Sequence, residues 1–217
     1  MNNKKIIIGI IIIILVIVIG IVLLLTNPKY DKNMIGTFYA KSVDTTYILN
    51  IEKNHTATLT YSEFEENKEK KLTWDNKHIN DNGVEVEYSF ENDKLLVKYI
   101  RGTLEFSKDE NIKRSQKFYQ VMFKSDADDI EVSNFENFID QYLIVSNVKH
   151  ISKEETKNTL LNMFNKYSNE VSEELLSSAS LNASCTMTAY GTNTELDILK
   201  NILESSEIVR RVYETNI

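Results

Sequence analysis

An α+β architecture is predicted for this chain of 217 residues, with a membrane-spanning helix, then an antiparallel β-meander or small barrel, then a domain of mixed helices and strands. Three observations predict it. An uncharged apolar run lies near the N-terminus, a stretch with period two follows, and a helical period begins after residue 115. The predicted units are residues 1–29, 30–114 and 115–217.

The run Ile6–Leu25 holds twenty residues without a charge. At about 1.5 Å of rise per residue, such a helix spans a hydrocarbon core of roughly 30 Å. Lys4 and Lys5 precede it, so the positive-inside rule keeps the N-terminal tail in the cytoplasm. We therefore expect a single-pass protein of the cell membrane whose bulk is extracytoplasmic.

Between Ile35 and Lys108, β-branched and aromatic residues alternate with polar ones in six or seven short segments. The breaks carry Asn, Asp and Gly, as in Asn80–Gly83, which suits tight turns with positive φ. An antiparallel meander that closes into a small barrel would remove the exposed edges. In this interpretation the charged run Glu63–Lys71 is a hairpin tip, and Trp74 belongs to the core.

Strand and helix periods alternate in residues 115–217. Strands are predicted at KFYQVMF, VKHI, CTMTAY and IVRRVY. Three predicted helices between them carry apolar residues at helical spacing: Phe135, Phe138, Ile139 and Tyr142; Leu160, Met163, Phe164 and Tyr167; Leu196, Leu199, Ile202 and Leu203. Ser152 with Glu155 and Thr192 with Glu195 form capping boxes. This order predicts a ferredoxin-like split βαβ domain with a short helical lobe.

A strand-to-helix junction and a closing strand carry a family resemblance. The residues concerned are Val148, Ile151, Ser152, Lys153, Glu154 and Glu155, with Ile208, Val209 and Val212. Through them, residues 115–217 resemble the extracellular domain of the FtsX-type cell-division permease. The resemblance implies a partner-binding module without catalytic residues, whose lobe contacts peptidoglycan hydrolases in Gram-positive relatives.

The resemblance has limits in this sequence. The permease has four membrane helices where one is predicted here, and its Asn-Pro-Leu-Pro turn is replaced by residues 180–184, SLNAS. Residues 35–108 faintly resemble a lipocalin-type meander through residues 36–38, GTF, and 102–104, GTL.

No catalytic constellation stands out among the residues that usually carry chemistry. His55, His78 and His150 lack the spacing of a zinc site. Cys185, the only cysteine, alternates with apolar residues on a predicted strand and is expected in the core. We therefore expect no enzyme activity, no metal and no cofactor.

Charge patterning points in the same direction. Asp126, Asp128 and Asp129 lack the Gly and the terminal Glu of a calcium loop and suit the start of a helix. The net charge is −3 for residues 30–114 and −7 for residues 115–217. Nucleic acid is therefore not an expected partner.

The predicted lobe is the leading candidate site. It is short and Ser-rich, so it cannot bury all of its large apolar residues: Phe164, Tyr167, Val171, Leu175 and Leu176. We expect them to bind another envelope protein, such as a peptidoglycan hydrolase or a cell-division component. The alternative is lipid or small-molecule binding by the β-meander, with the distal domain as a spacer. An apolar cavity around Trp74 would favour that alternative, although six or seven short strands leave little lumen.

Overall fold

The computed structural model describes residues 30, 32–63, 66–167 and 181–216, without the side chains of residues 63 and 164–167. None of the helices in these ranges has the length and apolar character needed to cross a membrane. The predicted anchor, Ile6–Leu25, lies outside the described residues.

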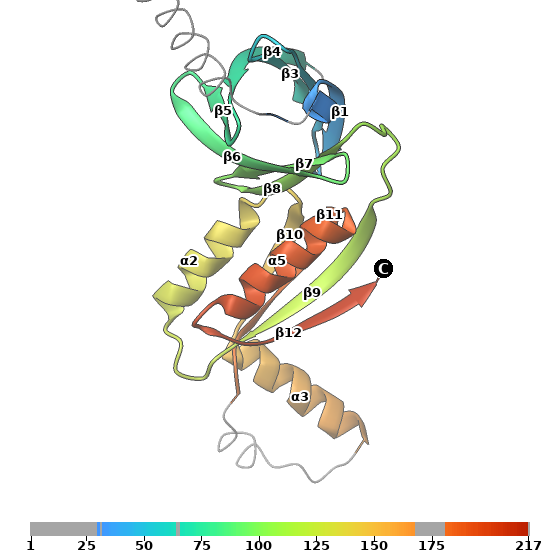
Figure 1. Ribbon diagram of the computed structural model, residues 1–217. Helices are drawn as coiled ribbons and strands as arrows, with labels where there is room; N and C mark the ends of the chain where they lie inside the picture. Colours follow the sequence, from blue (N-terminus) through green and yellow to red (C-terminus); the bar gives the residue numbers. More distant parts are fainter. Residues whose placement is uncertain (1–29, 31, 64–65, 168–180, 217) are drawn as a thin grey trace, which may run out of the picture.

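Eight antiparallel strands form a closed barrel in which each strand pairs with the next along the chain, and β1 meets β8 through Tyr39 and Ser107. Figure 1 shows the barrel nearly end-on. The strands are β1 (Gly36–Lys41), β2 (Thr46–Ile51), β3 (Thr56–Glu63), β4 (Glu66–Trp74), β5 (His78–Asp81), β6 (Val84–Glu91), β7 (Lys94–Tyr99) and β8 (Gly102–Ser107), after a 3-10 turn η1 (Lys32–Met34).

The closed meander is confirmed, but the predicted number of strands is too low. The missed strand is β5, which has only four residues and a polar sequence, HIND. Most of the run Glu63–Lys71, which was predicted to be a hairpin tip, lies in a strand. β4 begins at Glu66, and its pairing with β3 extends from Glu66 opposite Glu63 to Thr73 opposite Thr56.

Turn chemistry explains two of the sharp reversals. Asn82 and Gly83 join β5 to β6 with φ of 52° and 94°, and Asn92 and Asp93 join β6 to β7 with φ of 52° and 60°. Asn, Asp and Gly tolerate this left-handed backbone, so the predicted turns are confirmed.

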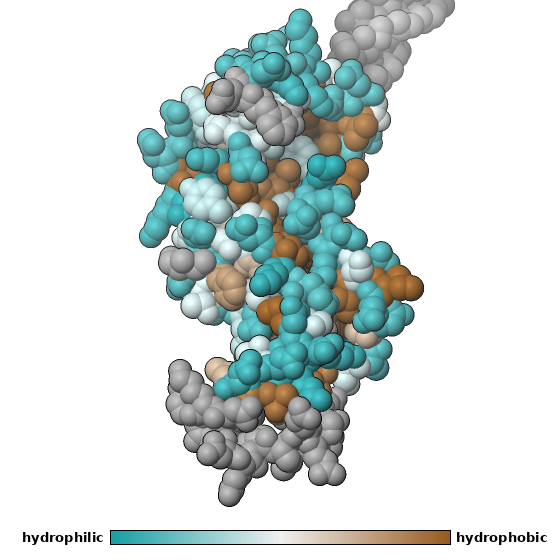
Figure 2. All heavy atoms as spheres, turned by 180° about the vertical axis from the view of Figure 1, so that it is seen from behind, coloured by the Kyte–Doolittle hydropathy of each residue, from teal (hydrophilic) through white to brown (hydrophobic). Residues whose placement is uncertain are grey.

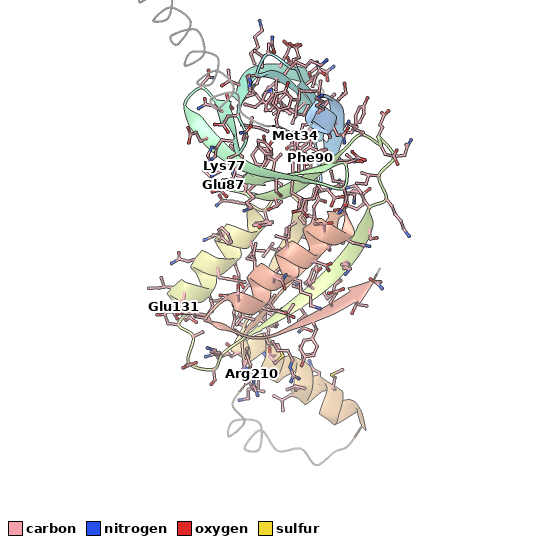
Figure 3. All side chains as sticks on the ribbon, viewed as in Figure 1. Met34, Lys77, Glu87, Phe90, Glu131 and Arg210 are labelled. Carbon is pink, nitrogen blue, oxygen red and sulfur yellow. The ribbon has the colours of Figure 1, made fainter. Side chains whose placement is uncertain are left out.

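Part of the barrel interior is filled by side chains. Phe38 and Phe106 are fully buried, and Phe38 meets Phe90 edge to face with ring centroids 6.1 Å apart. Met34 and Phe90 point into the barrel in Figure 3. Trp74 is 3% exposed, which confirms its predicted place in the core.

A four-stranded antiparallel sheet forms the second domain, with strand order β10-β11-β9-β12. Its elements are β9 (Ser115–Phe123), α2 (Asp129–Asp140), β10 (Val145–Ile151), α3 (Lys153–Tyr167), β11 (Ser184–Gly191), α5 (Asn193–Ser205) and β12 (Val209–Asn216). In Figure 1, α2 and α5 lie on one face of the sheet, and α3 projects from its far end. Because β11 lies between β9 and β10, the two βαβ units interleave in the predicted split order.

Capping residues set the helix starts. Asp128 accepts a hydrogen bond from the N–H of Glu131 at 2.7 Å, and Ser152 accepts one from the N–H of Glu155 at 3.1 Å. The Ser152 box is therefore confirmed, and Asp128 serves as a helix cap.

The helix–sheet core contains Cys185, Leu196 and Leu199, each fully buried as predicted. Two residues of the predicted apolar faces instead lie at the surface, Phe138 at 48% and Met163 at 56% exposed. The reason is that the sheet covers only part of α2, and α3 extends beyond its edge. Seen from behind, the surface is mainly hydrophilic, with separate apolar patches rather than a continuous apolar face (Figure 2).

An ion-pair cluster joins β9, β12 and α5. The Glu214 carboxylate accepts a hydrogen bond from the Lys117 ammonium and lies 3.2 Å from that of Lys200. The bond from Lys117, reinforced by Lys200, lowers the pKa of Glu214.

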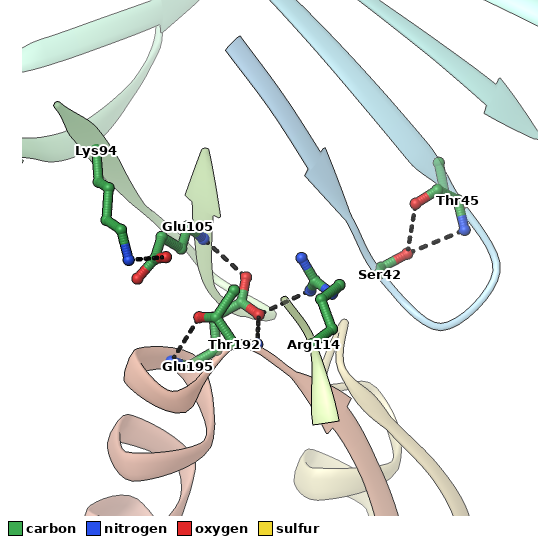
Figure 4. Close-up of polar contacts among 7 residues, drawn as sticks. All are labelled: Ser42, Thr45, Lys94, Glu105, Arg114, Thr192 and Glu195. Atoms are coloured by element: carbon green, nitrogen blue, oxygen red, sulfur yellow. Dashed lines mark hydrogen bonds and ion pairs between the residues drawn. The ribbon is translucent and has the colours of Figure 1, made fainter. Parts of the chain in front are cut away.

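Buried polar contacts join the two domains (Figure 4). Glu195, at the start of α5, accepts hydrogen bonds from the backbone N–H of Glu105 in β8 at 2.8 Å and from the guanidinium of Arg114 at 2.7 Å. Glu105 is itself buried and pairs with Lys94 at 2.8 Å. Burial raises the pKa of Glu195 to about 7, although Arg114 and the N–H groups of Glu105 and Thr192 act in the opposite direction. The predicted capping box of Thr192 and Glu195 is confirmed, and it has this second role.

Candidate ligand-binding site

The barrel contains a cavity of about 430 Å³. Six apolar side chains from strands β3 to β8 form its walls: Leu59, Leu72, Ile79, Val86, Val97 and Leu104. Each lies on the strand face that the two-residue alternation turns inward. The cavity therefore contradicts the expectation of little lumen, because eight strands enclose more space than six or seven.

Polar groups also line this cavity. We call them the polar collar: Tyr47, Tyr61, Lys70, Asp81 and Tyr99. The Lys70 ammonium donates a hydrogen bond to the Asp81 carboxylate at 2.6 Å, and the two side chains are 44% and 27% exposed. An ion pair thus lies on the inner side of the barrel, between the apolar walls and the opening.

Electrostatics fixes the charge states within the polar collar. The hydrogen bond to Asp81 raises the pKa of Lys70. Burial raises the pKa of Tyr99, and the neighbouring Tyr47 and Asp81 raise it further. At neutral pH Lys70 is therefore an ammonium paired with Asp81, and the neutral hydroxyl of Tyr99 can both donate and accept hydrogen bonds.

The cavity opens beside the end of the β6–β7 ladder. The β6–β7 ladder runs only from Tyr88 paired with Val97 to Glu91 paired with Lys94, whereas residues 84–87 of β6 pair with β5. β7 itself ends at Tyr99, two residues after the last pair, so the ladder does not continue along the first half of β6. At this opening Val84 is 58% and Ile100 is 90% exposed, so the rim is partly apolar.

One residue of the second domain also lines the cavity. Leu143 lies between α2 and β10, and its N–H donates to the carbonyl of Arg101 at 2.8 Å. Its own carbonyl accepts from the N–H of Val43 at 3.1 Å. The second domain therefore contributes a side chain to the cavity and is hydrogen-bonded to two of the hairpins at its open end.

The opposite end of the barrel is closed by an aromatic cluster. The Trp74 indole N–H donates to the carbonyls of Glu52 and Thr56, both at 3.1 Å. The rings of Tyr30 and His55 each lie 5.0 Å from that of Trp74, centroid to centroid. The cavity thus lies toward the other end of the barrel and not around Trp74.

The histidines and the cysteine lie apart from this cavity. His150 pairs with Glu136 at 2.8 Å on the second domain, and His78 lies 3.6 Å from Asp75 on the barrel. Burial raises the pKa of the Cys185 thiol to about 12, so it is a poor nucleophile. Across the part of the chain that the structure describes, three or more His, Cys, Asp or Glu side chains do not gather into a group that could hold a metal.

The lobe residues predicted to bind a partner cannot be placed. Val171, Leu175 and Leu176 lie outside the described residues, and the side chains of Phe164 and Tyr167 are not described. The role of these five residues stays a prediction.

Comparison with known proteins yields partial structural matches. No protein-family model matches the chain, and a search of curated proteins finds no match. A lipocalin lipoprotein that affects virulence in Streptococcus pneumoniae is similar at 18% identity with a TM-score of 0.33, over 38% of this chain and 100% of that chain. A second lipoprotein of that organism matches at 18% identity with a TM-score of 0.33, over 37% and 96%. None of these comparisons supports the resemblance to the FtsX-type permease, which remains a prediction.

Sequence reasoning missed Lys70, Asp81 and Leu143. A usable signal existed for Lys70, because it precedes Leu72 and Trp74 by two and four residues and so shares their inward face. Asp81 follows Ile79 in the same way, but β5 itself was not predicted. Leu143 reaches the cavity only through the packing of the two domains, which no local pattern encodes.

Proposed function

We propose that this protein binds one small amphiphilic molecule inside its barrel. The cavity of about 430 Å³ carries the proposal, and its size falls in the range of roughly 300–1,000 Å³ that is usual for ligand sites. Its apolar walls suit a hydrocarbon chain or ring, and the polar collar suits a head group. A barrel of eight strands is large enough to hold one small ligand.

We further propose that the barrel works next to a membrane, on its extracytoplasmic side. The basis is the apolar run Ile6–Leu25, which 10 residues separate from Gly36 at the start of β1. Even fully extended, at about 3.5 Å per residue, this segment keeps the barrel within roughly 35 Å of the anchor. Single-chain amphiphiles of the envelope would then be the nearest source of ligand.

Residues 30–217 are a suitable test protein, because the buried apolar side chains of the described chain lie between Met34 and Val209. A series of alkyl compounds with one head group and increasing chain length would be titrated against it by displacement of a polarity-sensitive dye. Burying each CH₂ contributes about 0.8 kcal/mol, so the Kd should fall about fourfold per carbon until the cavity is full.

A pair of variants places the ligand. Leu72→Trp adds a large ring to the cavity wall and should weaken binding by about tenfold or more. Ile48→Trp adds the same ring at a site that is 37% exposed and outside the cavity lining, and should leave binding unchanged. Circular dichroism would check that both variants fold. Unaltered binding by folded Leu72→Trp would refute the proposal.

Protein binding by the lobe is the second candidate function. The observation that favours it is Met163, which leaves more than half of its apolar side chain exposed on α3, next to the predicted lobe residues. Affinity capture from envelope extract would compare residues 30–217 with a variant that carries Leu175→Asp and Leu176→Asp. Loss of a hydrolase or division protein from the variant would support this function. Retention of the same proteins by both would refute it.

A further inference from the structure

The polar collar is electrically balanced before any ligand enters, and this balance determines which head group fits. Lys70 and Asp81 project inward from neighbouring strands, and their charged atoms lie 2.6 Å apart. At this separation the ammonium and the carboxylate act on a third group as a dipole, not as a net charge.

The other charges around the opening are balanced as well. Lys98 also lines the cavity and pairs with Glu87 at 3.3 Å, and the two side chains are 60% and 66% exposed. The lining adds one further cation, Arg101, and one further anion, Glu85. The opening therefore has no marked excess of either sign.

A head group at the level of the collar meets hydrogen-bonding groups of both kinds. The Lys70 ammonium has three N–H donors and gives one to Asp81. The Asp81 carboxylate accepts from Lys70 and from the side-chain amide of Asn82 at 3.2 Å, and it has lone pairs left for another donor. The hydroxyls of Tyr47 and Tyr99 can act as donor or acceptor.

A fixed charge gains little at such a site. A carboxylate head near Lys70 would also lie near Asp81, and the repulsion would offset most of the attraction, while the head would still lose its hydration. A quaternary ammonium near Asp81 would be attracted to that carboxylate but repelled by the Lys70 ammonium. A hydroxyl-bearing head, in contrast, can accept from Lys70 and donate to Asp81 without such a cost.

We infer that the cavity selects a single-chain amphiphile with an uncharged, hydroxyl-bearing head group over one whose head is a carboxylate or a quaternary ammonium. The inference rests on the proposed function, since it specifies the ligand of the same cavity. Monoacylglycerols represent this class, and fatty acids and alkylammonium ions represent the two classes that the collar disfavours.

Three probes with a decanoyl or decyl chain test the selection: monodecanoylglycerol, decanoate and decyltrimethylammonium. Each would be titrated at pH 7.5 into residues 30–217 by calorimetry, below its micelle-forming concentration. The glycerol head should bind on the order of tenfold more tightly than either ion, because an uncompensated charge at the collar is costly.

Two collar variants should change the order of preference in opposite directions. Asp81→Asn leaves Lys70 without its carboxylate, so decanoate should gain at least about tenfold relative to monodecanoylglycerol. Lys70→Gln leaves Asp81 alone, so decyltrimethylammonium should gain instead. Lys200→Gln, which alters an ion pair of the second domain outside the cavity lining, is the matched control and should leave the order unchanged.

The outcomes separate the inference from the proposed function. If none of the probes binds, the proposed function fails. If the probes bind and compete with the dye, but decanoate binds as tightly as the glycerol head or neither variant changes the order, the ligand site stands and the head-group selection is refuted. The expected order, together with the relative gain of decanoate in Asp81→Asn and of decyltrimethylammonium in Lys70→Gln, supports the two together.

Discussion

Replacing Gly102 by Ala tests the contact between the barrel and the second domain. Gly102 begins β8 with φ of 112°, and a Cβ there would lie 2.6 Å from Cε1 and 2.8 Å from Cδ1 of Tyr142. That ring is 6% exposed, and the Tyr142 N–H and carbonyl are hydrogen-bonded to Ile139 and Val145, both at 2.9 Å, so the ring cannot readily move aside.

The magnitude follows from two costs. A positive φ at a residue other than Gly costs about 1–3 kcal/mol, and overpacking a buried site costs about 1–3 kcal/mol more. Gly102→Ala should therefore lower the free energy of unfolding by about 2–6 kcal/mol, out of the roughly 5–15 kcal/mol that is usual for a folded protein. With a urea m-value of about 2 kcal/mol/M, the unfolding midpoint should fall by about 1–3 M.

Gly83→Ala is the matched control for this experiment. Gly83 has φ of 94°, and no atom lies within 4 Å of the position of its Cβ, so only the backbone cost applies. Urea unfolding followed by circular dichroism would compare both variants with residues 30–217. Equal destabilisation by the two substitutions would refute the packing argument. If the argument holds, Tyr142→Leu should recover part of the loss in the Gly102→Ala background.

Three further predictions concern single residues. Glu195→Ala should lower the free energy of unfolding by about 3–5 kcal/mol, because it leaves the buried Arg114 unpaired. Glu131→Ala, at the equivalent but exposed capping position of α2, should lower it by only about 1 kcal/mol. Urea unfolding would compare the two variants. Cys185 should resist iodoacetamide at pH 8 until the protein unfolds, as read by mass spectrometry; rapid labelling of folded protein would contradict its burial. Because the folded-state pKa of Glu214 is lowered, its stabilising effect is present above its unfolded pKa of about 4.5 and disappears as pH falls through the folded value. Glu214→Gln should reduce the loss of unfolding free energy at acidic pH by on the order of 1 kcal/mol. An unchanged dependence of the unfolding free energy on pH would argue against the ion pairs.

Much of the fold could be predicted from local pattern. Alternation identifies the long strands because each has one face in a core, and the capping boxes fix where α3 and α5 begin. The short β5 escapes because four residues give too few alternations to stand out. The lengths of α2 and α3 that pack on the sheet depend on tertiary contacts, so the exposure of Phe138 and Met163 could not be anticipated.

The candidate site was harder to predict than the fold. Lys70 lies in a run of charges, EENKEKK, that indicates a solvated hairpin, and only its spacing from Leu72 suggests an inward side chain. The contact of Glu195 with the N–H of Glu105 spans 90 positions of sequence. Pairings of that separation arise from the way two completed domains meet, and a single sequence holds no local signal of them.

Leu143 connects the cavity to the second domain. Its side chain lines the cavity, and its backbone is bonded to the hairpins that carry Val43 and Arg101. A ligand that packs better against one position of Leu143 than another would bias the segment between α2 and β10. The same segment leads through β10 into α3 and the predicted lobe. By reciprocity, a partner on the lobe that biases this segment would change the affinity of the barrel for its ligand by the same factor that the ligand changes the affinity for the partner.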